Sequence, residues 1–226
     1  MGVSSPEVIT KKIDNVKKEP YENVTIDVEE LHQGKVMEKM GERKAQLSDM
    51  VPDGKGRVRL DYNMTSRGLI GFRSEFLTLT SGSGLLYHTF DKYGPIVQGL
   101  HTGRRNGALI SIGQGKALPY ALFNLQERGK MIIENGIEVY EGMIVGIHSR
   151  NNDLVVNPLK GKQLTNVRAS GNDEAVTLTT PIQVTLEFAL EFINDDELVE
   201  VTPNSLRIRK KFLKEHERKK AARAAS

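Results

Sequence analysis

The run Arg57-Val58-Arg59-Leu60-Asp61-Tyr62-Asn63-Met64 carries the clearest fold signal in the chain, because polar and apolar residues alternate strictly along it. This period of two predicts a half-buried strand whose apolar side chains point to a core. The earlier run Val24-Thr25-Ile26-Asp27-Val28 alternates in the same way and predicts a second strand. The turn-forming run Pro52-Asp53-Gly54-Lys55-Gly56 lies directly before Arg57. It predicts a tight connection to a further strand over residues 45–51.

Two helices and a last strand complete this unit. Apolar residues at helical spacing predict one helix over residues 31–40 and a second over residues 69–79, with Ser66 as its expected N-cap. A fourth strand is expected over residues 85–90. The order βαββαβ is that of the ferredoxin-like arrangement, so we expect an α+β fold with a ferredoxin-like domain over residues 20–97. Its antiparallel sheet leaves one face free for a partner.

The second half of the chain is less regular. Short apolar runs separated by glycines predict a mostly β domain over residues 98–226. Residues 151–174 hold few large apolar side chains and predict a long exposed loop. Two alternating runs joined by a turn predict a hairpin over residues 198–209, and a basic helix is expected to follow from Lys210. Residues 1–19 are interpreted as a linker or the end of a preceding domain.

Several chemical classes are excluded by what the sequence lacks. The chain has no cysteine, which rules out a disulfide scaffold, a cysteine zinc site and a cysteine nucleophile. The five histidines show no HxxH or HExxH spacing, and there is no GxxxxGK[ST] phosphate loop or GxSxG elbow. No apolar run approaches 18 residues, so no membrane span is predicted. We therefore expect no catalytic residue, no metal and no cofactor in this chain, and we expect a cytoplasmic protein without a membrane partner.

Positive charge gathers at the C-terminal end. The net charge of the chain is +3, yet residues 206–226 hold nine basic and two acidic side chains, so the remaining residues sum to −4. A neutral body with a basic tail favours a polyanionic partner. A solvated helix end is the alternative interpretation. The candidate RNA contacts in this run are Arg207, Arg209, Lys210 and Lys211.

The expected loop carries a second set of candidates. Residues 157–171 interleave basic side chains with amides and hydroxyls, which suit RNA phosphates and 2′-hydroxyl groups. An ordinary polar loop is the alternative, because no RNP or GXXG motif accompanies it. Arg67 and Arg73 on the second helix of the first domain are weaker candidates. The candidate RNA contacts in the loop are Lys160, Lys162, Gln163, Thr165, Asn166, Arg168 and Ser170.

Several long motifs, in the right order, resemble the BipA/TypA family of translational GTPases. The resemblance covers residues 6–223. Among the motifs that carry it are Ser66-Arg67-Gly68-Leu69-Ile70-Gly71-Phe72-Arg73-Ser74-Glu75-Phe76, Val139-Tyr140-Glu141-Gly142, Gly146-Ile147-His148-Ser149-Arg150, Arg168-Ala169-Ser170-Gly171 and Leu198-Val199-Glu200-Val201-Thr202-Pro203.

This resemblance implies a C-terminal fragment: a domain similar to the fifth domain of elongation factor G, followed by the domain peculiar to the family. Members bind the ribosome near its A site and are implicated in large-subunit assembly and stress adaptation. The resemblance further implies that a loop matching residues 160–174 reaches A-site tRNA. It also implies GTP and magnesium in the parent protein, but no GTPase activity in this chain, because the GTPase domain is absent.

The expected partners are therefore ribosomal RNA, A-site tRNA and ribosomal proteins. A different class of function stays open beside RNA binding. The chain is alternatively a protein-interaction module that docks, through the free sheet face, on ribosomal proteins or on the parent GTPase domain. Exposed apolar side chains on that face would favour this alternative.

Overall fold

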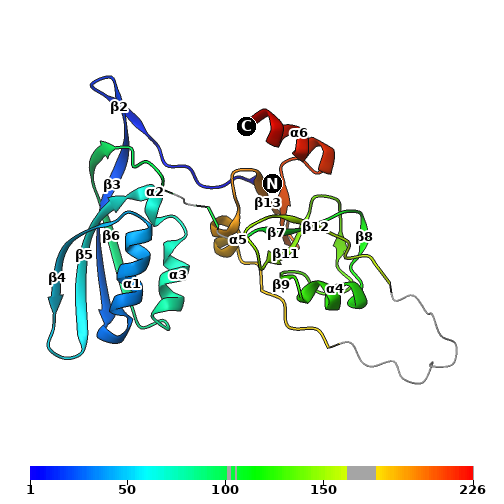
Figure 1. Ribbon diagram of the computed structural model, residues 1–226, viewed down its shortest axis with the longest axis horizontal. Helices are drawn as coiled ribbons and strands as arrows, with labels where there is room; N and C mark the ends of the chain where they lie inside the picture. Colours follow the sequence, from blue (N-terminus) through cyan, green and yellow to red (C-terminus); the bar gives the residue numbers. More distant parts are fainter. Residues whose placement is uncertain (101–102, 105, 162–176, 226) are drawn as a thin grey trace. The chain divides into compact units, whose positions relative to one another are not determined.

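The computed structural model describes residues 1–100, 103–104, 106–161 and 177–225, and it has a mixed α+β fold rich in sheet (Figure 1). Two compact units make up the chain. The first unit is Pro6–Gly103, and the second combines Met1–Ser5 with Arg104–Ser226. Each unit has its own hydrophobic core.

The first unit is built on one antiparallel sheet. Its strands lie in the order β6–β3–β5–β4, and β2 forms a hairpin with the start of β3. The strand bounds are β2 Lys11–Ile13, β3 Val16–Glu29, β4 Gln46–Pro52, β5 Arg57–Thr65 and β6 Leu85–Pro95.

Three helices cover one face of this sheet (Figure 1). They are α1 Glu30–Glu42, α2 Ser66–Leu69 and α3 Phe72–Leu79. The sequence predicted one continuous helix where α2 and α3 stand. The chain breaks there because Gly71 adopts the left-handed conformation, with φ 69°, at the start of α3. The N-cap of α2 is Thr65 rather than Ser66, since the Thr65 hydroxyl accepts the N–H of Gly68 at 3.2 Å.

The core of the first unit follows the alternation of β5. Leu60 and the other apolar residues of this strand are buried, as is Ile26 in β3. They pack against α1 and α3, chiefly on Phe72 and Phe76. Truncating such a buried aromatic side chain to alanine typically costs about 3–5 kcal/mol. The predicted helical stripe is wrong at Leu31, which is 70% exposed, because α1 turns Val36 toward the sheet instead.

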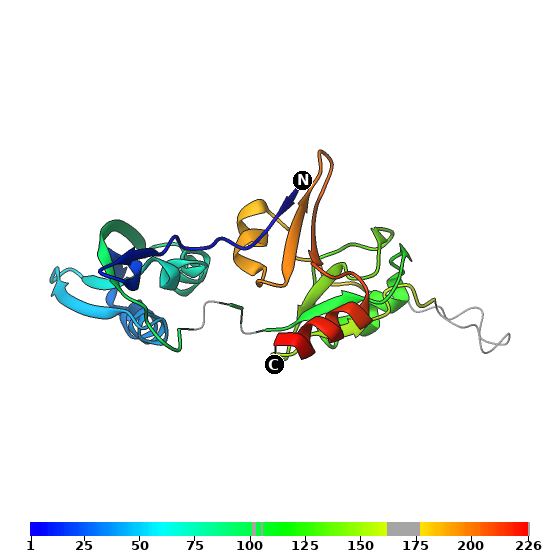
Figure 2. The same cartoon turned by 90° about the horizontal axis from the view of Figure 1, so that it is seen from above.

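Within its described residues, the second unit, drawn mainly in green to red in Figures 1 and 2, contains three small sheets. Their strand orders are β12–β7–β11–β9, β10–β8 and β1–β13–β14. The strand bounds are β1 Gly2–Val3, β7 Ala108–Ser111, β8 Gly115–Lys116, β9 Gly129–Met131, β10 Glu138–Val139, β11 Ile144–His148, β12 Leu154–Val156, β13 Glu197–Val201 and β14 Leu206–Lys210. The helices are α4 Pro119–Gln126, α5 Leu186–Phe192 and α6 Glu215–Ala225.

Two segments differ from the sequence-based expectation. Residues 1–19 contribute β1 to the second unit, where it pairs with β13, and β2 to the first. Residues 151–174 were expected to form a loop, but β12 lies within them and runs parallel to β7. A three-residue strand with two partly buried positions is too short to show a clear period in the sequence.

Close backbone packing holds the larger sheet of the second unit together. A Cβ atom on Gly129 would lie 1.9 Å from the carbonyl oxygen of Ile147, on the neighbouring strand β11. A Cβ on Gly107 would lie 2.0 Å from the carbonyl oxygen of Asn152. Only glycine allows these approaches without a shift of the backbone. Among the described residues, no helix combines the length and the apolar character needed to cross a bilayer.

Candidate nucleic-acid interface

Lys160 is the described member of the loop candidates. It follows β12 and is exposed at the end of a short segment that is tied to the core. The N–H of Leu118 donates to the carbonyl of Pro158 at 2.9 Å, and the N–H of Leu159 donates to the Asn157 side chain at 2.9 Å. The charge of Lys160 is thus presented to solvent from a fixed base. The other loop candidates, Lys162, Gln163, Thr165, Asn166, Arg168 and Ser170, lie outside the described residues.

The hairpin candidates divide sharply according to burial. Lys210, the last residue of β14, is 2% exposed. Its ammonium group makes ion pairs with Asp153 at 2.6 Å, Asp196 at 2.7 Å and Glu197 at 2.8 Å. Arg104 pairs with the same Glu197, its Nη2 lying 2.7 Å from Oε1. We call these five side chains the buried ion cluster, after the buried side chains of Lys210, Glu197 and Arg104; Asp153 and Asp196 lie at its solvent edge, with 37% and 61% of their side chains exposed.

Each charge of the buried ion cluster lies within 4.0 Å of an opposite charge. Burial alone lowers the pKa of Lys210, but the carboxylates of Glu197, Asp153 and Asp196 outweigh it and hold that pKa above its usual value. Burial alone raises the pKa of Asp153, but Lys210, the Ala108 N–H and Arg104 outweigh it and hold that pKa below its usual value. The cluster links the hairpin to Asp153, which directly precedes β12, and to Arg104, which precedes β7.

Two of the four hairpin candidates are therefore already paired with carboxylates of the protein itself. Lys210 has no exposed charge to offer a phosphate, and the guanidinium of Arg209 is paired with Glu200 at 2.7 Å. We do not retain either residue as an RNA contact, because separating these pairs would leave the buried Glu197 and the partly buried Glu200 without these cations. Arg207, partly exposed, and Lys211, exposed, stay available at the surface.

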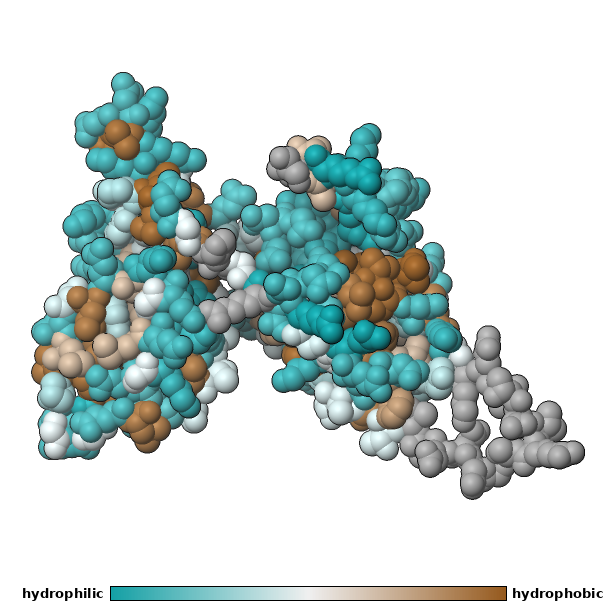
Figure 3. Space-filling view, viewed as in Figure 1, coloured by the Kyte–Doolittle hydropathy of each residue, from teal (hydrophilic) through white to brown (hydrophobic). Residues whose placement is uncertain are grey.

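The helix α6 adds further surface cations. Its start is held by the Glu141 carboxylate, which accepts the N–H of Glu215 at 3.2 Å. Lys219 is paired with Glu215 at 2.6 Å. In the part of the chain that the structure describes, Lys214, Lys220 and Arg223 have no ion pair within 4.0 Å. Figure 3 accordingly shows a mostly hydrophilic surface over this helix.

The two weaker candidates on the first unit also differ in whether their charge is available to a partner. Arg67 makes a two-point ion pair with the buried carboxylate of Glu19, at 2.9 and 3.1 Å, and donates to the Val97 carbonyl at 2.9 Å. The hydrogen bonds that Arg67 donates to Glu19 raise the pKa of this already basic arginine further. Arg67 is thus a structural arginine. Arg73 is exposed on α3.

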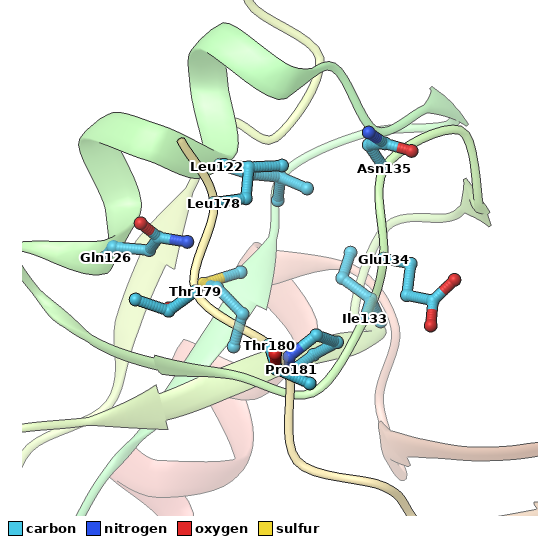
Figure 4. Close-up of a pocket in the computed structure, with 10 residues that line it drawn as sticks. Leu122, Gln126, Ile133, Glu134, Asn135, Leu178, Thr179, Thr180 and Pro181 are labelled. Atoms are coloured by element: carbon cyan, nitrogen blue, oxygen red, sulfur yellow. The ribbon is translucent and has the colours of Figure 1, made fainter. Parts of the chain in front are cut away.

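A pocket of about 310 Å³ lies where the described chain resumes at residue 177 (Figure 4). Leu122 and Leu178 lie side by side at its wall, and Gln126 faces Glu134 and Asn135 across it. None of its lining residues is basic, so the pocket does not suit a phosphate group. Its residues are Leu122, Gln126, Met131, Ile133, Glu134, Asn135, Leu178, Thr179, Thr180 and Pro181.

Across the described ranges, histidine, aspartate and glutamate side chains do not converge in a group of three that could hold a metal ion. The candidate interface consists of surface cations on one unit: Lys160 at the base of the loop, Arg207 and Lys211 at the hairpin, and three cations on or just before α6. Sequence patterning indicated the first three of these as individual candidates and the other three as part of the basic tail. It could not separate the first three from Arg209 and Lys210, since all five are basic residues in polar stretches.

Two family models match consecutive parts of the chain. Residues 16–101 match the family model for the elongation factor G C-terminus, and residues 106–215 match that for the TypA/BipA C-terminal domain. "Large ribosomal subunit assembly factor BipA" of Escherichia coli K12 is 65% identical over 224 residues. The Haemophilus influenzae protein of that name is 63% identical over 226 residues. These alignments cover 99% and 100% of this chain, which spans 37% of the length of either relative.

Proposed function

Since the chain belongs to the TypA/BipA family, we propose that it is the ribosome-contacting portion of a large-subunit assembly factor. In this proposal the chain binds ribosomal RNA and A-site tRNA, and so supports subunit assembly and adaptation to stress. It has no catalytic role and binds no cofactor; GTP and magnesium belong to the parent protein. The observation that carries the proposal is the pair of family matches, in order, over nearly the whole chain.

The surface charges support an RNA partner in particular. Lys160, Lys211 and Lys214 are exposed and, within the described residues, have no acidic partner within 4.0 Å. Cations that are not satisfied within the protein can release counterions from an RNA backbone, which is the main source of sequence-independent affinity. We propose that Lys160, together with Lys162 and Arg168, contacts phosphates, while Gln163, Thr165, Asn166 and Ser170 hydrogen bond beside them.

A triple substitution of Lys160, Lys162 and Arg168 by alanine tests the loop. We expect weaker binding to purified ribosomes and to tRNA, with the slope of log affinity against log salt falling by about 0.7–0.9 for each phosphate that the variant no longer neutralises. Binding is measured at a series of salt concentrations. The matched control removes three exposed cations of the first unit that are not RNA candidates, Lys17, Lys35 and Lys55, and should leave the slope unchanged. An unchanged slope in the loop variant removes the loop from the proposal.

We also propose that the first unit has the ferredoxin-like arrangement. The antiparallel strand order β6–β3–β5–β4, with helices after β3 and β5, supports this, as does the match to the elongation factor G C-terminus.

Incubation of the chain with GTP should release no phosphate above the buffer rate. Measurable turnover would contradict the non-catalytic role.

One observation favours a second candidate function, docking on a protein. On β6, Tyr87 is 62% and Leu85 50% exposed. Their partners across the strand pair are Thr25 and Asp27, which alternate with the buried residues of β3 and thus lie on the face away from the helices. Large apolar side chains gathered on an open sheet face are typical of protein interfaces.

A double substitution, Leu85→Ser with Tyr87→Ser, tests this second candidate. If a protein docks here, the variant should lose a ribosomal contact that persists at high salt, because apolar burial is little screened. The measurement is co-sedimentation with ribosomes at high salt. Equal sedimentation of the variant and the unaltered chain under those conditions contradicts docking through this face.

A further inference from the structure

A second pocket of about 210 Å³ lies in the second unit, between the β8–β10 pair and the hairpin. Its lining combines one arginine, one carboxylate and one amide with the backbone of a glycine and two larger side chains. The lining residues are Gln114, Gly115, Glu138, Val139, Tyr140 and Arg207. No lining residue of this pocket belongs to the loop over residues 157–171.

Arg207 reaches this pocket without a carboxylate partner of its own. Its partner across the hairpin is Glu200. Both oxygens of Glu200 are already occupied, because Oε1 pairs with Arg209 at 2.7 Å and Oε2 accepts the hydroxyl of Tyr140 at 2.6 Å. Among the described residues, no carboxylate lies within 4.0 Å of the Arg207 guanidinium. A planar set of N–H donors is therefore left at the pocket.

The tyrosine is fixed in the un-ionised form. Burial raises the pKa of Tyr140, and the hydrogen bond to Glu200 raises it further. The Tyr140 hydroxyl thus stays a donor to Glu200 throughout the physiological range and does not compete for Arg207. The hydrogen bond holds the Tyr140 ring at the pocket wall.

The remaining polar groups select among ligands. A bare phosphate would suit Arg207 but would be repelled by Glu138, which lines the same pocket. Guanine matches both residues, because its O6 and N7 accept two hydrogen bonds from one arginine fork, while its N1–H and amino group donate to a carboxylate. Adenine presents an amino group in place of O6, and cytosine and uracil lack the N7 edge. The ring of Tyr140 supplies apolar surface for the flat base.

We propose that this pocket binds an unpaired guanine base of single-stranded RNA. Arg207 reads the O6 and N7 edge, Glu138 reads the N1 and amino edge, and Gln114 adds an adaptable amide. The inference rests on the proposed RNA-binding function and adds base selection to it. Single-stranded segments are where proteins read base edges in RNA, since the A-form major groove is too narrow for side chains.

The experiment uses uridine heptamers with a central guanosine, inosine, adenosine or cytidine, and measures their affinity for the full chain by fluorescence anisotropy. We expect the guanosine heptamer to bind roughly tenfold more tightly than the adenosine or cytidine heptamer. The inosine heptamer, which lacks the amino group, should fall between them. In the unaltered chain, the guanosine heptamer should also shift the amide resonances of Gln114, Gly115 and Glu138.

Two conservative variants separate base reading from charge. Arg207→Lys keeps the charge but loses the planar fork, so the guanosine preference should drop toward parity while the salt slope is retained. Glu138→Gln should abolish the discrimination between guanosine and inosine. The matched control, Lys211→Ala, removes a neighbouring exposed cation and should weaken all four heptamers alike.

The failures of the two proposals are distinguishable. Equal affinity for all four heptamers, with ribosome binding intact, overturns the guanine pocket and leaves the proposed function standing. Resonance shifts that are the same for the adenosine and guanosine heptamers also overturn it. Absence of binding to ribosomes and to every heptamer overturns the proposed function itself.

Discussion

Lys210 and Lys211 are adjacent in the sequence and have the same side chain, yet they belong to two different regions of the second unit. Lys210 ends β14 inside the buried ion cluster, whereas Lys211 is exposed on the way to α6. Lys211 is the first residue beyond the end of β14, so a single step along the chain moves the ammonium group from the interior to solvent. A basic run is therefore not one functional unit, because burial decides which of its charges are available to a partner.

The largest expected effect tests the buried side of this comparison. Lys210→Ala leaves Glu197, which has no exposed surface, without one of its two cations, and should destabilise the second unit by about 3–5 kcal/mol. Amide hydrogen exchange of β13 and β14 measures the change within this unit alone. Lys211→Ala is the control and should alter exchange by no more than about 0.5 kcal/mol. Similar exchange rates in the two variants would contradict the claim that Lys210 stabilises the second unit and Lys211 does not.

A smaller effect is expected on the first unit, where Arg67 and Arg73 show the same contrast between a cation paired with a buried carboxylate and an exposed cation. Arg67→Ala removes the two-point partner of Glu19, whose side chain is 2% exposed, but the Val97 N–H still donates to that carboxylate at 2.7 Å. The expected loss of stability is therefore about 2 kcal/mol, measured by urea unfolding of the first unit. Arg73→Ala, at an exposed site on α3, serves as the reference and should be nearly neutral. A neutral Arg67→Ala would show that Glu19 is satisfied without it.

Acid should weaken the buried ion cluster through its carboxylates, whereas the surface lysines and arginines keep their charge at low pH. The pKa of Asp153 in the folded chain is held below the usual aspartate value of 3.8. Its stabilising contribution is therefore complete above that value and is lost as the pH falls through it toward the folded pKa. Hydrogen exchange of β13 and β14, followed from mildly acidic pH down through the usual aspartate pKa, should show a declining stability. Asp153→Asn should flatten this decline, and an equally steep decline in that variant would assign it to other groups.

The smallest effect on stability is expected on α6. Replacing Lys214, Lys220 and Arg223 together by alanine should change the free energy of unfolding by less than about 0.5 kcal/mol for each site, since all three are exposed. The same variant should bind RNA more weakly, with a salt slope reduced by about 0.7–0.9 for each phosphate that is left without its cation. Circular dichroism and a salt titration measure the two effects. Reduced helix content without any change of slope would make α6 a structural element only.

Local patterning was enough to predict much of the first unit. The alternation of β3 and β5 appears directly in the sequence because one face of each strand is buried and the other is not. The break between α2 and α3 was missed, because the apolar stripe continues across Gly71 although the backbone there is left-handed.

In the second unit, the turn of the β13–β14 hairpin was predicted, since Thr202-Pro203-Asn204-Ser205 carries strong turn signals of its own.

Residue types and their order were sufficient to establish the composition of the interface: which residues are basic, where they cluster, and to which family their motifs belong. The folded chain was needed to show that Lys210 and Arg209 are held by carboxylates while Arg207 faces a pocket with Glu138. The physical reason is that charge and periodicity are local properties of a chain. The pairing of charges is not a local property. The partners of Lys210 come from β13 and from the turn before β12, and the packing of the core, which no local pattern records, brings them to it.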